Sequence, residues 1–273
     1  MLGKLASNDV EKYASFWGQF GSVLKEGPSE DHANREKIAK LLRFMSSESG
    51  SDSHSVSLTD YVGRKKAHQD KIYYLTGDSY SVIANSPYLE AFRKHDIEVL
   101  LMTDRIDEWM MGYLTEFDGL KFQDISRGEL DLEELTDSKK EKSEEEKSDE
   151  ENENKIEKDL CARVKELLDG KVDDVRATQR LTDSPACLVV GEHDMGEQMR
   201  KIMQAAGQSV PDSKPVLEVN IEHPLVVRLK SEDETEKAKM LAGLLFDQAA
   251  LSAGRPLDNP AQFVQQLNKM MFA

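Results

Sequence analysis

The stretch that decides the fold is "KIYYLTGDSYSVIANSPYLEAFRKHDIEVLLMTDRIDEWMMGYL", residues 71–114. Apolar runs typical of buried strands, at 71–77 and 98–103, alternate in it with segments of helical periodicity at 86–95 and 105–114. Strands that are separated by helices tend to run parallel and to be covered on both faces. The stretch therefore predicts a small α/β layer with partly parallel strands buried on both faces.

The residues before this stretch are expected to be mostly helical. An amphipathic helix is predicted from an N-cap at Asn8 or Asp9 to a stop at Gly27–Pro28, and a second helix over 32–44. Seven serines in the twelve residues 46–57 then indicate a solvated loop.

An acidic segment divides the chain. The net charge is -16, and twelve acidic and five basic side chains at 133–157 account for seven of these charges. Aromatic residues are absent from 129–155, which we interpret as a solvated acidic linker, with an acidic interaction tail as the alternative. The linker separates a domain at 1–128 from one at 156–273. Because phosphate backbones and anionic lipids repel such a chain, nucleic-acid and membrane partners are not expected.

The second domain is expected to be α+β and to end in a helical hairpin. One helix is predicted at about 232–252, and Gly254 ends it, while Asn259 and Pro260 supply the N-cap and first position of the last helix. Two helices cannot close a core alone, so the inner face of the hairpin needs a partner. The apolar residues of this face are Leu241, Leu244, Leu245, Leu251, Phe263, Leu267 and Met270.

The sequence contains no recognisable catalytic or metal-binding motif. GxxxxGK[ST], GxGxxG, HExxH and CxxC are all absent, and the six histidines have no metal-ligand spacing. Cys161 and Cys187 both lie in apolar patterns typical of small buried side chains, and a reducing cytoplasm suits them. No catalytic residue and no metal ligand is therefore predicted.

A methionine stripe occurs in "MGEQMRKIMQAAG", residues 195–207. In a helix, Met195, Met199, Ile202 and Met203 share one face, while charged residues point elsewhere. Such a stripe is typical of a buried core, but methionine also suits surfaces that bind many partners, because its side chain is flexible and polarizable. Both interpretations remain open from the residues alone.

Three long blocks carry a family resemblance: "SFWGQFGSVLKEGPSEDHANREKIAKLLRF" (15–44), "SPYLEAFRKHDIEVLLMTDRIDEWMMGYLTEFDG" (86–119) and "RLTDSPACLVVGE" (180–192). In these blocks the chain closely resembles bacterial members of the ninety-kilodalton heat-shock chaperone family, the high-temperature protein G type. The match runs from about Leu2 to Phe272 and is interrupted only in the acidic segment.

The resemblance implies the domain identities. Residues 1–128 would be the end of the family's middle domain, and 156–273 its C-terminal dimerisation domain. The nucleotide-binding domain would lie upstream of Met1, so ATP and magnesium are cofactors of the full-length family, and none is expected in this chain. The expected location is cytoplasmic.

The resemblance also implies partners and site residues. Homodimerisation is expected through the hairpin residues given above, together with binding of non-native client proteins and contact with other cytosolic chaperones. The helix with the methionine stripe is associated with client binding, which favours exposure of Met195, Met199, Ile202 and Met203. Trp109 marks a second candidate client surface.

Two alternatives remain. One alternative is a purely structural dimerisation module without a client surface. The other alternative is a small α/β hydrolase or transferase that uses residues 71–114, which requires convergent polar groups in a pocket there.

Overall fold

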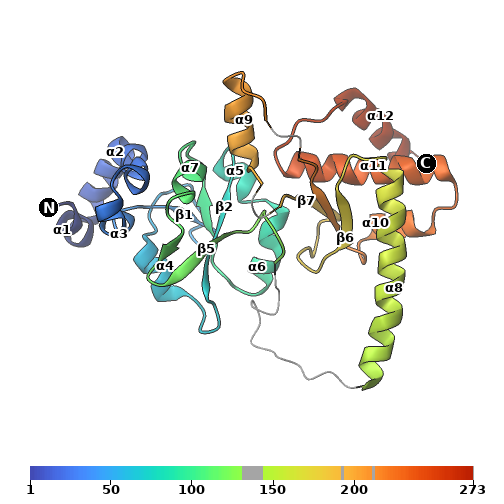
Figure 1. Ribbon diagram of the computed structural model, residues 1–273, viewed down its shortest axis with the longest axis horizontal. Coiled ribbons are helices and arrows are strands. Elements are labelled where there is room, and N and C mark those ends of the chain that lie inside the picture. Colours follow the sequence, from blue (N-terminus) through green and yellow to red (C-terminus); the bar gives the residue numbers. More distant parts are fainter. Residues whose placement is uncertain (131–143, 192–193, 211–212, 273) are drawn as a thin grey trace. The chain divides into compact units, whose positions relative to one another are not determined.

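Contacts within the chain divide it into two units, each built around its own sheet. The computed structural model (Figure 1) describes residues 1–130, 144–191, 194–210 and 213–272, and the statements below concern these residues. Unit 1 consists of Met1–Asn85, Phe92–Ile125 and Gln198–Ser209. Unit 2 consists of Ser86–Ala91, Ser126–Glu197 and Val210–Ala273.

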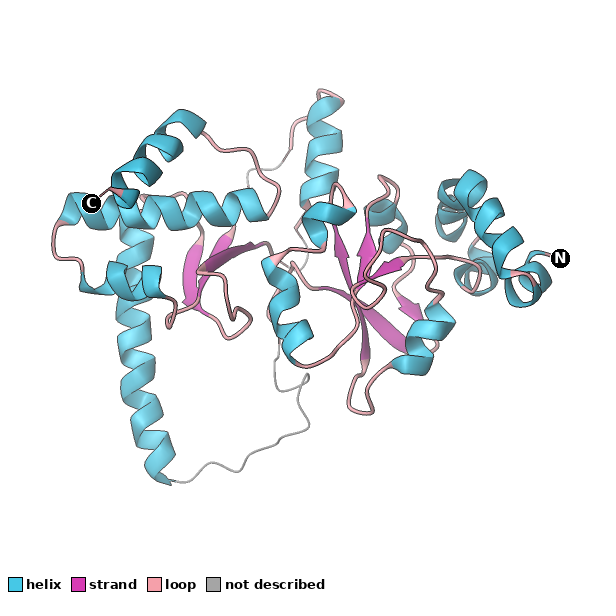
Figure 2. Cartoon of the chain, turned by 180° about the vertical axis from the view of Figure 1, so that it is seen from behind, coloured by secondary structure: helices cyan, strands magenta, loops and turns pink. Residues whose placement is uncertain are grey.

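Unit 1 has a five-stranded sheet with helices around it (Figure 2). Its strands are β1 (Met45–Ser46), β2 (Lys71–Thr76), β3 (Leu100–Met102), β4 (Glu116–Phe117) and β5 (Leu120–Asp124). Its helices are α1 (Leu2–Asn8), α2 (Val10–Glu30), the 3-10 turn η1 (His32–Asn34), α3 (Arg35–Ala39), α4 (Leu58–Arg64), α5 (Tyr80–Ile83), α7 (Asp107–Met111) and most of α9 (Glu197–Ala205). The turn η2 (Pro87–Leu89) belongs to unit 2, and α6 (Glu90–Lys94) is shared between the two units.

The predicted partly parallel layer is confirmed. The strand order is β1-β3-β2-β5-β4, and β2 runs parallel to both of its neighbours, with Tyr74 opposite Leu100 and Ile72 opposite Phe122. The outer strands β1 and β4 pair antiparallel. Ile72, Tyr73 and Leu75 of β2 are buried, which agrees with a strand covered on both faces.

The first long helix begins where the sequence predicts and ends later. The Asp9 side chain accepts a hydrogen bond from Lys12 N at 3.1 Å and caps α2. The predicted stop at Gly27–Pro28 is wrong, because α2 continues to Glu30 with Pro28 buried inside it. Its last turn is closed by Asp31 N, which donates to Gly27 O.

Other short elements of unit 1 also differ from expectation. The helix predicted at 32–44 is reduced to η1 and α3, because Phe44 forms an isolated bridge with Val56 and the chain then enters β1. The serine-rich loop at 46–57 is therefore anchored at both ends. Elements α5, β4 and β5 were not predicted from the sequence, because runs of two to five residues carry too little periodicity.

Unit 2 packs helices on a three-stranded sheet. Its strands are β6 (Asp174–Ala177), β7 (Ala186–Val189) and β8 (Val216–Val219), in the order β6-β8-β7, with β6 parallel and β7 antiparallel to β8. Its helices are α8 (Glu144–Leu167), α10 (Pro224–Ser231), α11 (Thr235–Ser252) and α12 (Pro260–Met271). The core combines buried residues of α8 and α11 with those of the sheet, among them Val164, Leu217 and Ala242.

The predicted hairpin is present. Asn259 Oδ1 accepts from Gln262 N at 3.1 Å, Pro260 begins α12, and Gly254 adopts a positive φ of 72° after α11. The helix predicted at 232–252 begins three residues later, at Thr235. Helix α10 was missed, although its signal is of the same kind, because His223 caps it and Pro224 takes its first position.

The linker expected at 129–155 is only partly described. Residues 131–143 lie outside the described residues, and α8 already begins at Glu144, inside the expected linker. The division into units also departs from the predicted boundaries. Residues 198–209 group with unit 1, although they come late in the sequence.

Candidate functional site

The carboxyl ends of the parallel strands are the place where ligands bind in many α/β sheets, particularly where neighbouring connections lead in opposite directions. In unit 1 this place lies beyond β2, whose parallel neighbours are β3 and β5. The residues that follow β2 hold helix α9. Gln198 Nε2 donates to Gly77 O at 2.8 Å, and Lys201 Nζ lies 2.5 Å from Asp78 Oδ2.

Gly77 is closely packed against α5. A Cβ atom at residue 77 would lie 2.1 Å from Ile83 Cγ2, so a larger residue there would force the Ile83 side chain to move. Glycine therefore lets α5 fold back directly over the end of β2 and leaves the Gly77 carbonyl free to accept from Gln198.

A carboxylate from a second helix binds the first turn of α9. Glu108, on α7, accepts a hydrogen bond from Met199 N at 2.8 Å. The backbone N–H groups of the first helical turn have no partner within the helix, and the helix dipole favours a negative charge there. Glu108 therefore caps the first turn of α9 from another helix.

The predicted methionine stripe is neither core nor free surface. Met199 and Met203 are half-buried, whereas Ile202 is 37% exposed, and the residues from Gln204 to Ser209 are exposed. Met195 is also half-buried, but it lies before the first turn of α9 and groups with unit 2, so the four residues do not form one helical face. The predicted stripe is corrected accordingly to Met199, Ile202 and Met203.

Trp109 lies on the same helix as Glu108. Its side chain is 48% exposed, and its ring centroid is 5.4 Å from that of Tyr113. The Glu108–Met199 hydrogen bond thus joins α7, which carries Trp109, to α9, which carries Ile202. The structure brings the two predicted surfaces of the sequence onto adjoining elements of unit 1.

A buried ion cluster fixes the start of α7. Lys25, on α2, is 1% exposed, and its Nζ lies 2.7 Å from both Asp104 Oδ2 and Asp107 Oδ1. Burial raises the pKa of the Asp107 carboxyl, and the adjacent Lys25 ammonium acts in the opposite direction. The ammonium also lies 5.2 Å from the ring centroid of Phe44. Sequence reasoning missed this cluster, because its members are far apart in the chain.

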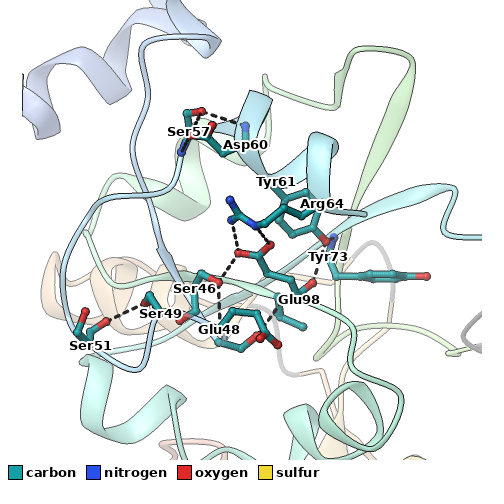
Figure 3. Close-up of polar contacts among 12 residues, drawn as sticks. Ser46, Glu48, Ser49, Ser51, Ser57, Asp60, Tyr61, Arg64, Tyr73 and Glu98 are labelled. Atoms are coloured by element: carbon teal, nitrogen blue, oxygen red, sulfur yellow. Dashed lines mark hydrogen bonds and ion pairs between the residues drawn. The ribbon is translucent and has the colours of Figure 1, made fainter. Parts of the chain in front are cut away.

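A second polar network, shown in Figure 3, ties β1 and α4 to the segment before β3. Glu98 Oε1 accepts from Ser46 Oγ at 2.5 Å and from Arg64 at 2.8 Å. The Tyr61 hydroxyl donates to the Glu98 carbonyl at 2.9 Å and accepts from Tyr73 N at 3.0 Å. These groups satisfy one another, which is typical of a structural network.

The hairpin residues divide into two sets. Leu241, Leu244 and Leu245 are buried in unit 2, and the first and last of them belong to its core, so most of their apolar area is already removed from water within one chain. Their role at a dimer contact stays a prediction. Phe263, Leu267 and Met270 are half-buried, and Leu251 is exposed.

Helix α12 has no buried residue. Val264 is 53% exposed, and Met271 and Phe272 are exposed still more. A cavity of about 920 Å³ lies beside α11 and α12, and its lining includes Lys171, Asp247 and Gln266. The hairpin therefore presents apolar and polar groups that unit 2 itself does not cover.

The described part of the chain shows neither a metal site nor a membrane span. No group of three or more His, Cys, Asp or Glu side chains there is placed to hold a metal ion. No helix within the described ranges has the length and apolar character of a membrane span. Cys161 and Cys187 are both buried, as predicted.

The fold first defines the class of protein, a mixed α/β protein with two separate sheets. A helix of the chain itself occupies the carboxyl ends of the parallel strands, and exposed large apolar side chains lie on adjoining helices. The family model described as Hsp90 protein matches residues 1–273. The chain therefore belongs to the Hsp90 family of heat-shock chaperones.

Proposed function

We propose that this chain is the C-terminal part of an ATP-dependent Hsp90 chaperone that binds non-native client proteins and forms a homodimer. In this proposal the chain works in the cytoplasm beside other chaperones and catalyses no reaction. ATP and magnesium would be bound by a nucleotide-binding domain outside this sequence, which itself contains no phosphate-binding motif.

One observation carries the client-binding part of the proposal. Trp109 and Ile202 are large, exposed apolar side chains on two helices that the Glu108–Met199 hydrogen bond joins. The hydrogen bond holds the two helices in place, so that the exposed aromatic and aliphatic side chains can make apolar contacts with a client protein. The half-buried Met199 and Met203 add side chains that adapt to partners of different shape.

The dimer part of the proposal rests on α12. This helix is amphipathic and contains no buried residue, and Val264 and Met271 are prominent among its exposed apolar residues. A second hairpin that is related by a two-fold axis would cover this face with an identical one, because each copy offers the same surface.

Client binding is tested by suppression of aggregation of a heat-denatured protein. The double variant Trp109→Ser/Ile202→Ser should lose most of the suppression, with an unchanged circular dichroism spectrum. The matched control is Val23→Ser, which changes an apolar residue of unit 1 that is exposed to 59% and lies on α2. Equal suppression by the wild type and the double variant would show that this surface does not bind clients.

Dimerisation is tested by light scattering coupled to size exclusion. Val264→Asp should give monomers at micromolar concentration, because a dimer would have to bury the new carboxylate without a partner. Val227→Asp is the matched control, since Val227 is 49% exposed on α10 of the same unit. A chain that dimerises without suppressing aggregation would support the structural-module alternative.

A further inference from the structure

Helix α9 is attached to unit 1 at one end only. Gln198, Met199 and Lys201, within the first five residues of the helix, make polar contacts with unit 1. The residues from Gln204 to Ser209 are exposed, and both views show this end of the helix extending away from the other elements of unit 1 (Figures 1 and 2).

The helix buries little when it is attached. Gln198 is its only buried residue, and its apolar residues are half-buried or exposed. Elements with few buried apolar contacts open at a free-energy cost well below that of global unfolding. Release of α9 from unit 1 should therefore leave the core of the unit, which is made by other elements, intact.

The surface beneath α9 has a defined chemistry. It consists of the Gly77 carbonyl, the Asp78 carboxylate and the Glu108 carboxylate, and we call it the acceptor platform. Each of the three groups accepts a hydrogen bond. The Gly77 carbonyl accepts from a side-chain amide, Asp78 from an ammonium group, and Glu108 from a backbone N–H in the first turn of the helix. The platform therefore selects for a helix that begins there and carries a cation in its first turns.

We propose that α9 is a replaceable occupant of the acceptor platform, and that a cationic amphipathic helix of a client protein takes its place. The inference rests on the proposed chaperone function and specifies the class of client segment that this surface selects. The entering helix places an amide or hydroxyl donor at the Gly77 carbonyl and a lysine or arginine at Asp78. The displaced α9 leaves with its methionines uncovered.

Competition with α9 makes the proposal measurable. A ligand that needs the vacant platform binds with an apparent affinity reduced by the fraction of molecules in which the platform is vacant. A variant that weakens attachment of α9 must then bind the same ligand more tightly. The chain supplies its own probe, a dye-labelled peptide of residues 196–208, "GEQMRKIMQAAGQ".

The experiment measures fluorescence anisotropy of this peptide against the whole chain. In Lys201→Glu the helix repels Asp78, and the peptide should bind at least tenfold more tightly than to the wild type. Gln198→Ala is a second release variant, which removes the donor to Gly77. Lys4→Glu, an equal charge reversal at an exposed site on α1, should behave like the wild type.

The platform itself is tested by Asp78→Asn/Glu108→Gln. Added to either release variant, this change should weaken peptide binding at least tenfold, and a peptide with Glu in place of Lys201 should bind weakly throughout. Equal affinity of the peptide for the wild type and both release variants would overturn the proposal. So would peptide binding that is indifferent to the platform change.

The outcome is separate from that of the client assay. A chain that suppresses aggregation but fails the peptide test keeps the proposed function and loses this inference. A chain that does not suppress aggregation loses the proposed function, whatever the peptide does.

Discussion

At the scale of single residues, each unit contains buried or half-buried charged side chains that are held by specific partners within the same unit. Lys25 shares its ammonium between Asp104 and Asp107. In unit 2, Glu90 accepts from the backbone N–H groups of Thr182 and Asp183 at 2.6 and 2.9 Å, and from Ser184 Oγ at 2.5 Å. Removal of one partner from such a site costs more than the interaction itself contributes, because the other partner stays buried.

Lys25→Met should strongly destabilise unit 1. The change leaves Asp107, which is fully buried, without its cation, at an expected cost of about 3 to 5 kcal/mol. Urea unfolding followed by tryptophan fluorescence measures it, since both tryptophans, Trp17 and Trp109, lie in unit 1. Lys12→Met removes a surface ion pair instead and should cost less than about 1 kcal/mol. Similar losses in both variants would contradict the role of the buried cluster.

The Glu90 carboxylate should make stability depend on pH. Burial by itself raises the pKa of Glu90, but the hydrogen bonds from Ser184 and the backbone N–H groups outweigh it, and the pKa is lower than usual. A carboxyl whose pKa is depressed by folding contributes stability above its ordinary pKa of about 4.3, and this contribution disappears as the pH falls through the folded value.

Glu90→Gln should therefore lower the free energy of unfolding by about 1 to 2 kcal/mol at pH 7. The difference from wild type should shrink as the pH is lowered below about 4.3, since both chains are then uncharged at this position. Chemical denaturation at a series of pH values measures the difference. Glu26→Gln, at an exposed position, is the control. A difference that stays constant down to pH 2 would contradict the assigned charge state.

At the scale of elements, two amphipathic helices have different fates. Helix α9 begins on unit 1, where Glu108 caps it, and its apolar residues are half-buried or exposed. Helix α12 contacts α11 and has no buried residue of its own. Sequence periodicity predicts an apolar stripe on each of these helices. It shows which side of the helix is apolar, but not which other element packs against that side.

The methionines of α9 and its preceding residues provide the test at this scale. Triple replacement of Met195, Met199 and Met203 by serine should lower the melting temperature of the chain by only a few degrees. Truncation of a fully buried methionine costs about 2 to 5 kcal/mol of stability, and truncation of a half-buried one costs only a fraction of that. Suppression of client aggregation should fall. Met110→Ser, at a fully buried position of α7, is the control and should unfold unit 1. Unfolding by the triple variant would show that the stripe is core.

At the scale of the whole molecule, the acidic segment lies between the two described cores in the sequence. The core cluster of unit 1 runs from Tyr13 to Phe117, and the described core of unit 2 begins at Leu160. The acidic excess at 133–157 therefore falls between the two described cores.

Deletion of residues 136–153 should leave both cores intact. The deletion also removes residues 144–153 of α8, which precede the described core residues of that helix, and a change in the length of the connection alters the closure entropy only slowly. The melting temperatures should therefore change by about a degree or less. Differential scanning calorimetry of the deleted chain measures this, and light scattering checks that its oligomeric state matches the wild type. A large loss of stability would show that the acidic segment contributes contacts to a unit.

The sequence determined the local features of this protein. Alternating strand and helix signals at 71–114 predicted the partly parallel sheet, Asn259 and Pro260 predicted the start of the last helix, and the long blocks predicted the family. These features depend on residues close together in the chain, where periodicity and capping act directly.

Only the tertiary structure decided which surfaces meet. It placed β5 beside β2, Lys25 against Asp107 some eighty residues away, and Glu108 at the first turn of α9. It also withdrew Leu241 and Leu245 into the core and left Val264 exposed. The physical reason is that pairing across long separations depends on how the whole chain packs, and no local pattern of apolar and charged residues encodes which distant partner will cover a given face.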